Sequence, residues 1–274
     1  MAITIGAGWT VGAGWTVSDS GGGGGGGGTQ KAIFGYGLNN SYANQSITNL
    51  VSNTGVVATD TTGVGTARYD LAAATYGTDK AIFGSGNAGV LPYSAVTNKV
   101  SNTGVVATDT AGVGTGRASL AAAGYGTDKA IFGYGVGGAG GSTYYAMTNL
   151  VSNAGVVATD TTGVGTTRDY LAAAGYGTDK AIFGYGTVPG SNVSTTNLVS
   201  NTGVVATNTT GVGTVRSYLA ASGYGGDKAI FGYGFPSSAV SMTNLVSNTG
   251  VVGNDVTGVG TARGYLAAAG YSLT

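Results

Sequence analysis

The stretch DKAIFGYG, at residues 128–135, decides the fold because the chain repeats it. The repeated motif begins at five lysines, with serine in place of tyrosine in the second copy: Lys31, Lys80, Lys129, Lys180 and Lys228. Successive copies lie 48 to 51 residues apart, a period that is typical of propellers, solenoids and other repeat arrays. We therefore expect residues 29–274 to form one domain of equivalent units.

Each unit contains four short segments whose composition favours β-strands. In the third unit these segments are residues 119–125, 129–133, 148–153 and 155–159. The turn-forming sequences GTD and NAG separate the first segment from the second and the third from the fourth. Because none of the segments has helical periodicity, the unit is predicted to be a four-stranded antiparallel propeller blade.

The two ends of the repeat array complement each other. The first unit lacks its opening strand, and residues 264–271 at the C-terminal end supply a surplus copy of it. Joining the final GYSLT to the TQKAIFGYG that starts at Thr29 nearly restores GYGTDKAIFGYG. A ring closed in this way leaves no exposed sheet edge. The sequence therefore predicts an all-β, five-bladed β-propeller that is closed by the C-terminal strand.

One arginine precedes the small-residue strand of every unit, and the hydrophobic strand ends in glycines such as Gly35 and Gly37. This order of arginine, small-residue strand, hairpin and glycine-ending strand resembles the Kelch repeat. The matching arginines are Arg68, Arg117, Arg168, Arg216 and Arg263. The resemblance implies a propeller scaffold for residues 29–274.

The N-terminal part differs from the repeats. Residues 6–17 are the hexapeptide GAGWTV written twice, and residues 21–28 are eight glycines that are expected to act as a flexible linker. Exposed tryptophans favour contact with another molecule, so residues 1–20 are predicted to be an extended, strand-like anchor, with a floppy tail as the alternative. The anchor residues would be Trp9, Val11, Trp15 and Val17. This tail and the near-identical repeats resemble bacteriophage virion proteins of the fibre or decoration type.

The composition argues against several classes of function. Only 8% of residues are charged, with 11 basic and 11 acidic side chains, which argues against nucleic acid as a partner. Histidine and cysteine are absent, and no apolar run is long enough to span a membrane. Every ionisable motif recurs in most units, whereas enzymes bring unlike groups together at one site. We therefore expect no catalytic residues, no metal and no cofactor.

The repeated aspartates have a structural interpretation. The pairs exemplified by Asp128 and Lys129 are expected to be a turn-capping acid beside a solvated lysine, rather than a catalytic base with its modulator. A second acid lies eight residues before the arginine in most units, as Asp109 does before Arg117, and Asn208 takes its place in the fourth. These acids are predicted to pair with arginines within or between blades and so to fix their register.

Five segments, each between Gly-Tyr-Gly or Gly-Ser-Gly and the next Thr-Asn, differ in every unit. They are residues 38–47, 87–96, 136–147, 187–195 and 235–242. Equivalent loops of a propeller emerge on one face, and loops on a rigid scaffold commonly bind ligands. Their Tyr, Ser and Asn content is typical of antibody paratopes, although exposed loop tips also simply tolerate insertions. The predicted ligand-binding residues are Tyr42, Asn44, Tyr93, Tyr144, Tyr145, Asn192 and Phe235.

These observations favour a non-enzymatic protein of a virion or extracellular surface. Residues 1–28 would attach it to other proteins of a larger assembly, in which it would be homo-oligomeric, and the loop face would contact a host-surface glycan or protein. The alternative is an architectural decoration or filament subunit whose loops contact neighbouring copies. A hydrolase or lyase on a propeller is the least favoured class.

Overall fold

The computed structural model describes residues 3–4, 10–11 and 31–270. Every regular element in these residues is a β-strand, so the all-β prediction is confirmed. The described residues include no helix that could cross a membrane. In the tail, β1 (Ile3–Thr4) pairs with β2 (Thr10–Val11), which aligns Val11 with Ile3. The other predicted anchor residues, Trp9, Trp15 and Val17, lie outside the described residues.

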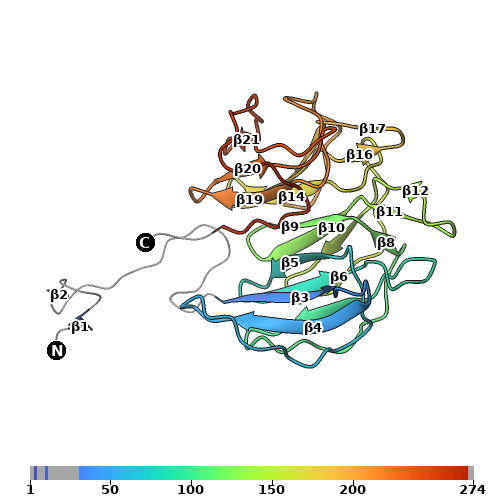
Figure 1. The fold of residues 1–274 in the computed structure, drawn as a ribbon, viewed down its shortest axis with the longest axis vertical. Helices are drawn as coiled ribbons and strands as arrows, with labels where there is room; N and C mark the ends of the chain where they lie inside the picture. Colours follow the sequence, from blue (N-terminus) through green and yellow to red (C-terminus); the bar gives the residue numbers. More distant parts are fainter. Residues whose placement is uncertain (1–2, 5–9, 12–30, 271–274) are drawn as a thin grey trace.

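Four units each form a three-stranded antiparallel sheet with the KAIFG strand in the middle. The strands are β5 (Ala72–Tyr76), β6 (Lys80–Gly84) and β7 (Thr97–Val100); β9 (Ala121–Tyr125), β10 (Lys129–Gly133) and β13 (Thr148–Val151); β14 (Ala172–Tyr176), β15 (Lys180–Gly184) and β18 (Thr196–Val199); β19 (Ala220–Tyr224), β20 (Lys228–Gly232) and β21 (Thr243–Val246). The first unit pairs only β3 (Ala32–Leu38) with β4 (Asn44–Val51). Figure 1 shows these sheets arranged side by side.

The fourth segment of each unit is less regular than predicted. In the third unit it joins β13 through two isolated bridges, Val151 to Val157 and Thr148 to Thr161, and forms no continuous strand. The bridged residues are three apart on β13 and four apart on the partner segment. One extra residue on the outer segment bulges and interrupts the ladder, so the sheet has three full strands and a bulged edge.

Two of the variable segments form short hairpins that the sequence did not predict. One pairs β11 (Val136–Gly137) with β12 (Thr143–Tyr144), and β11 also pairs with β8 (Arg117–Ala118). The other pairs β16 (Thr187–Val188) with β17 (Ser191–Asn192). Figure 1 shows β8, β11, β12, β16 and β17 on the right-hand side of the molecule, so these variable segments emerge on the same side.

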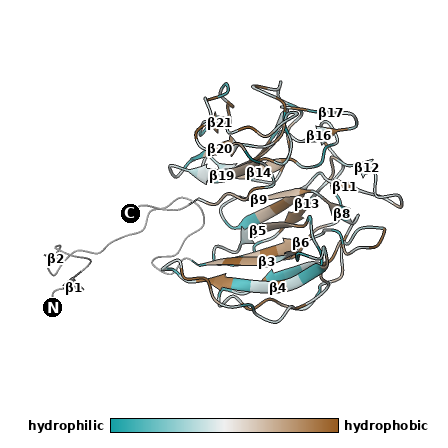
Figure 2. Ribbon diagram, viewed as in Figure 1, coloured by the Kyte–Doolittle hydropathy of each residue, from teal (hydrophilic) through white to brown (hydrophobic). Residues whose placement is uncertain are grey.

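Neighbouring sheets pack through a phenylalanine on one and a glycine on the other. A Cβ added to Gly133 would lie 2.7 Å from the ring of Phe183, so only glycine fits there. The same contact joins four successive pairs: Gly35 with Phe83, Gly84 with Phe132, Gly133 with Phe183, and Gly184 with Phe231. Figure 2 shows hydrophobic residues along β3 and β6. The repeated KAIFG strand is therefore the main apolar contact between units.

A buried polar network also joins neighbouring units. Arg68 donates from Nη2 to Asn98 Oδ1 at 2.6 Å, and Asn98 donates to Asp109 Oδ1 at 2.9 Å. Asp109 accepts a hydrogen bond of 2.6 Å from the Thr66 hydroxyl. The equivalent trios are Arg117, Asn149 and Asp160; Arg168, Asn197 and Asn208; Arg216, Asn244 and Asp255. Each network joins residues of successive repeats and so fixes their register.

The predicted Arg–Asp pairs are confirmed in two of these networks. Arg68 lies 4.0 Å from Asp109, and Arg216 lies 3.8 Å from Asp255, in each case from Nη1 to Oδ1. The sequence did not reveal the asparagine that connects the two charges. Each of these arginines is fully buried, and burial lowers its pKa. The asparagine supplies the acceptor that a buried guanidinium requires.

The hairpin aspartates have the structural role that was predicted. Lys129 donates to Asp128 Oδ1 at 3.0 Å, and Asn153 donates to Asp128 Oδ2 at 3.0 Å. The backbone of the same turn connects units, because Gly126 N donates to Asp179 O at 2.7 Å. The acid therefore orders a turn beside a half-exposed lysine.

The two ends of the array differ from its interior. Phe34 is 59% exposed, whereas the equivalent Phe132 is 3% exposed. Among the described residues β3 pairs only with β4, and residues 264–270 form no strand. A Cβ on Gly270 would meet Gly223 O, as a Cβ on Gly223 would meet Gly175 O. The C-terminal segment thus follows β19 as a further inner segment, and Figure 1 shows it beside β19.

Candidate ligand-binding site

Two consecutive residues vary from unit to unit, although the arginine before them and the leucine after them are constant. Each unit has an arginine, two variable residues and a leucine, and only the variable pair changes. The pairs are Tyr69 and Asp70, Ala118 and Ser119, Asp169 and Tyr170, Ser217 and Tyr218, and Gly264 and Tyr265. Sequence reasoning missed these positions, although variation between two fixed residues was a visible signal. The second residue of each pair begins the site described below.

The backbone brings these five second residues together. Each has a left-handed φ, from 48° at Tyr170 to 55° at Tyr265, which is uncommon for residues other than glycine. Consecutive members are hydrogen bonded: Ser119 N donates to Asp70 O at 2.9 Å, and Tyr170 N donates to Ser119 O at 3.0 Å. Tyr218 and Tyr265 continue the series in the same way. One residue from each unit is therefore held beside its counterpart by the main chain.

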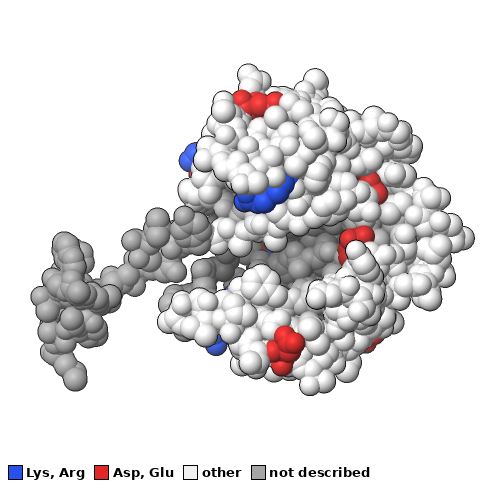
Figure 3. Space-filling view, in the orientation of Figure 1, with Lys and Arg blue, Asp and Glu red and all other residues white. Residues whose placement is uncertain are grey.

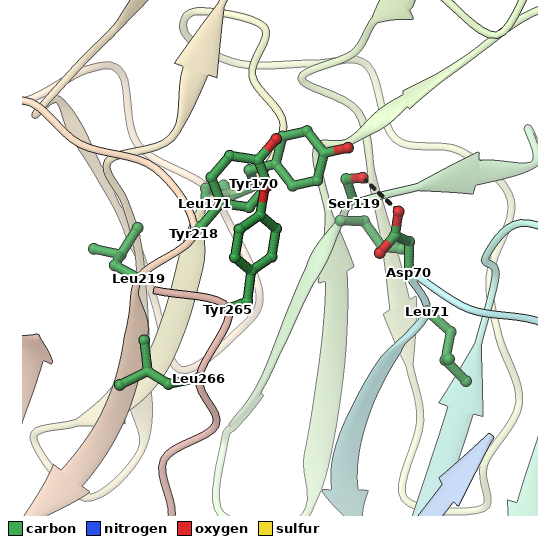
Figure 4. Close-up of a pocket in the computed structure, with 10 residues that line it drawn as sticks. Asp70, Leu71, Ser119, Tyr170, Leu171, Tyr218, Leu219, Tyr265 and Leu266 are labelled. Carbon is green, nitrogen blue, oxygen red and sulfur yellow. Dashed lines mark hydrogen bonds between the residues drawn. The ribbon is translucent and has the colours of Figure 1, made fainter. Parts of the chain in front are cut away.

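These five residues and the leucines that follow them line a cavity of about 160 Å³, here called the axial pocket. Figure 4 shows Asp70 and Ser119 on one side of it and Tyr170, Tyr218 and Tyr265 on the other. The Ser119 hydroxyl donates to Asp70 Oδ2 at 3.4 Å. The volume admits a few waters or one small polar group.

The aromatic side of the axial pocket is a stack of three rings. The Tyr170 and Tyr218 ring centroids lie 4.0 Å apart, and those of Tyr218 and Tyr265 lie 4.1 Å apart. The hydroxyl group of Tyr218 interacts with those of both neighbours, and burial together with these contacts raises its pKa. The pocket therefore combines an aromatic surface with hydroxyl groups, opposite a carboxylate.

A second layer of residues lies close to the axial pocket. Asp169 is 3% exposed, and its Oδ1 has no hydrogen-bond partner in the described part of the chain. Burial raises the pKa of Asp169 to about 7, and the nearby Asp70 carboxylate adds to the increase. The pKa of Asp70 is also raised by burial, against a smaller opposing effect of its hydrogen bond with Ser119. The charge of the buried Asp169 is therefore disfavoured by its surroundings and by Asp70, which lines the axial pocket.

The structure brings two predicted loop tyrosines to this layer. Burial raises the pKa of Tyr93, and Tyr170, Asp70 and Asp169 are among the groups that raise it further. Burial likewise raises the pKa of Tyr144, with contributions from Asp169 and Tyr170. These phenols therefore share the electrostatic environment of the axial residues, although neither of them is among the residues that line the axial pocket.

The other predicted loop residues have different positions. Phe235 packs near the axis, with its ring centroid 5.7 Å from that of Tyr265. Asn192 donates to Phe235 O at 2.7 Å and so connects two variable segments, while Asn44 makes a longer bond of 3.5 Å to Asn87 O. Tyr145 packs on its own hairpin, 3.2 Å from the place of a Cβ on Gly137. Tyr42 projects from its loop and is 84% exposed.

Charged side chains are sparse around the site. Figure 3 shows scattered acidic and basic residues on the face drawn, with no patch of one sign. Among the described residues that line the axial pocket there is no Lys or Arg. The described ranges also contain no group of three or more Asp, Glu, His or Cys residues that could hold a metal ion.

Comparison with other proteins leaves the site to be interpreted from its own chemistry. No protein-family model and no curated protein matches this chain. The axial pocket and the loops beside it contain hydrogen-bonding side chains, aromatic surface and carboxylates. This combination suits binding of a small polar group, because concave sites with a few placed polar groups are the usual form of ligand pockets.

Proposed function

We propose that the chain is a non-enzymatic surface protein of a virion or another extracellular assembly, which binds a host-surface glycan or protein. The axial pocket and the variable loops around it would make the contact. One observation carries this proposal: the side chains that differ between units gather at the axis and its loops, while those between the units repeat. A repeated scaffold with one varied surface is the arrangement expected of a recognition module.

The chemistry of the surface favours glycan over nucleic acid. Sugars offer a flat apolar face and many hydroxyl groups, which match tyrosine rings and polar acceptors. Tyr170 lines the axial pocket with Asp70, the Tyr93 phenol lies near the Asp70 carboxylate, and the Tyr144 phenol lies near Tyr170. Tyrosine gives a large contact area with few rotatable bonds, so it binds at a low entropic cost.

The scaffold is proposed to be a closed, Kelch-like ring of five blades. Support comes from the complementary ends: Phe34 is exposed, and Gly232 meets only Thr243 where its counterparts meet a phenylalanine. Closure would place Phe34 on Gly232, as Phe183 packs on Gly133. By the register of Ala172 with Gly184, the C-terminal segment would add to β3 with Ala267 opposite Gly35. The exposed sheet edge would then be covered.

The polar network gives the same closing contact. Arg263 is exposed, and within the described ranges its side chain donates only to Thr261 O, whereas the equivalent arginines also bind an asparagine of the next unit. At the other end of the array, Asn49 donates to Asp60 Oδ1 at 2.8 Å, as its counterparts do. A closed ring would let Arg263 bind Asn49 and complete a fifth network.

Residues 1–28 are proposed to attach the domain to other proteins of the assembly, with several copies of the chain in it. The alternative is a decoration or filament subunit, and the complementary ends favour it if they meet another copy instead of each other. Such head-to-tail contacts build filaments unless the rotation closes a ring. Concentration-dependent growth of the intact chain, seen by light scattering, would support this alternative.

A glycan array with the full chain tests the recognition function. We expect binding to a restricted set of glycans, and we expect Tyr93→Ala with Tyr144→Ala to weaken it by roughly tenfold or more. The control is Val156→Ala, which changes an exposed residue in the outer turn of a unit. Equal binding by the double variant and the control would contradict a loop-face site. Absence of glycan binding together with absence of adsorption to host cells would contradict the proposed function.

A further inference from the structure

We propose that the axial pocket binds a cationic ammonium group carried by a small polar ligand, such as the free amine of an amino sugar at the exposed end of a glycan. This inference rests on the proposed recognition function and names the chemistry that the pocket selects. It starts from an imbalance of charge at the axis.

Asp70 and Asp169 form no ion pair with a basic side chain in the described part of the chain. Within the described ranges, the ion pairs of the aspartates involve other positions, such as Asp109 with Arg68 and Asp128 with Lys129. Asp70 and Asp169 have no such partner there, and the buried arginines donate to asparagines between the units. Asp169 is buried, so its carboxylate has lost hydration, and the charge of Asp70 repels it. A cation at the axis would relieve both effects.

The other groups in the pocket suit an ammonium ion in particular. A primary ammonium group has three N–H donors and needs acceptors in several directions. Asp70 Oδ atoms, the Ser119 hydroxyl and the phenol oxygens of the three stacked tyrosines are acceptors from different units. The rings of Tyr170, Tyr218 and Tyr265 also present aromatic surface, which attracts cations that approach within about 6 Å. Because the cavity measures about 160 Å³, it admits a head group and excludes a folded chain.

Other ligand classes fit less well. An anion would meet the Asp70 carboxylate and no basic residue among the described residues that line the cavity. A metal ion would find too few carboxylates, since phenol and serine oxygens are weak ligands when protonated. A neutral polyol would leave the Asp70 carboxylate without an opposite charge. The amine-bearing ligand pairs with this carboxylate and still uses the hydroxyl groups.

Calorimetric titration of the full chain tests this inference with matched ligands. D-glucosamine carries the amine, N-acetyl-D-glucosamine has the same ring with the amine acylated, and choline carries the cation without a sugar. We expect glucosamine to bind roughly tenfold or more tightly than N-acetylglucosamine, because a charge-assisted hydrogen bond is lost on acylation. Raising the salt concentration should weaken glucosamine binding. Measurable choline binding would support recognition of the cation itself.

Two variants locate the binding event. Asp70→Asn removes the carboxylate that lines the pocket, and Asp169→Asn removes the buried carboxylate whose charge acts on Asp70 from outside the lining, so each should weaken glucosamine binding by roughly tenfold. Asp79→Asn is the control, since this acid lies in an exposed hairpin and pairs with Lys80. A thermal unfolding curve for each variant separates lost binding from lost structure.

The outcomes are distinct from those of the recognition test. Equal affinity for glucosamine and N-acetylglucosamine would overturn the ammonium inference, and the glycan proposal would stand. Glucosamine binding that is unchanged in folded Asp70→Asn and Asp169→Asn proteins would also overturn it. Binding of a neutral glycan on the array, with no response to glucosamine or choline, would overturn the inference alone.

Discussion

Two regions of this molecule are built from the same repeat, but one keeps its side chains nearly constant from unit to unit and the other varies them. Between units, Arg68, Asn98 and Asp109 form a network that returns with nearly the same residues in three further units. At the axis, backbone hydrogen bonds are equally regular, but the side chains include Asp70, Ser119 and Tyr170. Buried polar groups must be satisfied, which fixes the residues between units. At the axial pocket the main chain holds the five units together, so the side chains there are free to vary.

The largest loss of stability is expected from a change in the polar network between units. Arg168→Ala would leave Asn197 Oδ1 without its donor and open space beside the Tyr134 ring, which lies 4.6 Å from the guanidinium. Loss of one partner from a buried charged network costs about 3–5 kcal/mol of unfolding free energy. Urea denaturation would measure it, with Lys129→Ala, which breaks the half-exposed pair with Asp128, as the control. A loss below about 1 kcal/mol, the range of exposed pairs, would show that the network does not hold the units together.

The two ends of the array allow a test of whether the ring closes. If the ring closes, Phe34→Ala removes a contact equivalent to that of Phe132 and should cost about 3 kcal/mol. If the ring is open, Phe34 is mostly exposed and its replacement should cost little. Equilibrium unfolding of Phe34→Ala beside Phe132→Ala measures the difference. Near-zero loss for Phe34→Ala alongside a large loss for Phe132→Ala would contradict ring closure.

Asp169 gives an intermediate effect that depends on pH. Its pKa of about 7 exceeds the value of about 3.9 for an unfolded aspartate, so the folded protein holds the proton more tightly. The stabilising contribution is therefore complete below about pH 4 and is lost as the pH rises toward 7. Its size is on the order of 4 kcal/mol, because about three pKa units separate the two states.

The measurement is the unfolding free energy of the wild type and of Asp169→Asn at pH 4 to 8. The wild type should lose stability relative to the variant across the range from about pH 4 to 7, because only the wild type has this titrating group. The other groups near Asp169 are Asp70, Tyr93 and Tyr144, which both proteins share. Parallel curves for the two proteins would contradict a raised pKa at Asp169.

Much of the fold followed from the sequence because the strands are defined by local patterns. The KAIFG strand was predicted at residues 129–133 and is β10 over the same residues. The fourth segment was predicted as a strand, but one extra residue between Val157 and Thr161 breaks its ladder. Periodicity does not reveal such a bulge, since it depends on the partner strand.

The site was predictable only in part, for a similar reason. Tyr93 and Tyr144 stood out because they interrupt the repeat in long loops. Asp70 and Ser119 stand where the other three units have tyrosine, directly before the constant leucine. Their role depends on the contact between units, which one repeat does not show. Asn149 lies within a strand sequence and gains its role only from Arg117 of the preceding linker. Residues that act between repeats cannot be recognised from one repeat alone.

The most direct test of the central claim replaces the two exceptional residues of the axis with the one that recurs there. The double variant D70Y/S119Y would give all five units tyrosine at this position, where Tyr170, Tyr218 and Tyr265 already adopt the required left-handed φ. We predict an unfolding free energy within about 1 kcal/mol of the wild type, together with loss of binding to the glycans that the wild type recognises. Retained binding by the folded variant would contradict the claim that the axis is the recognition site.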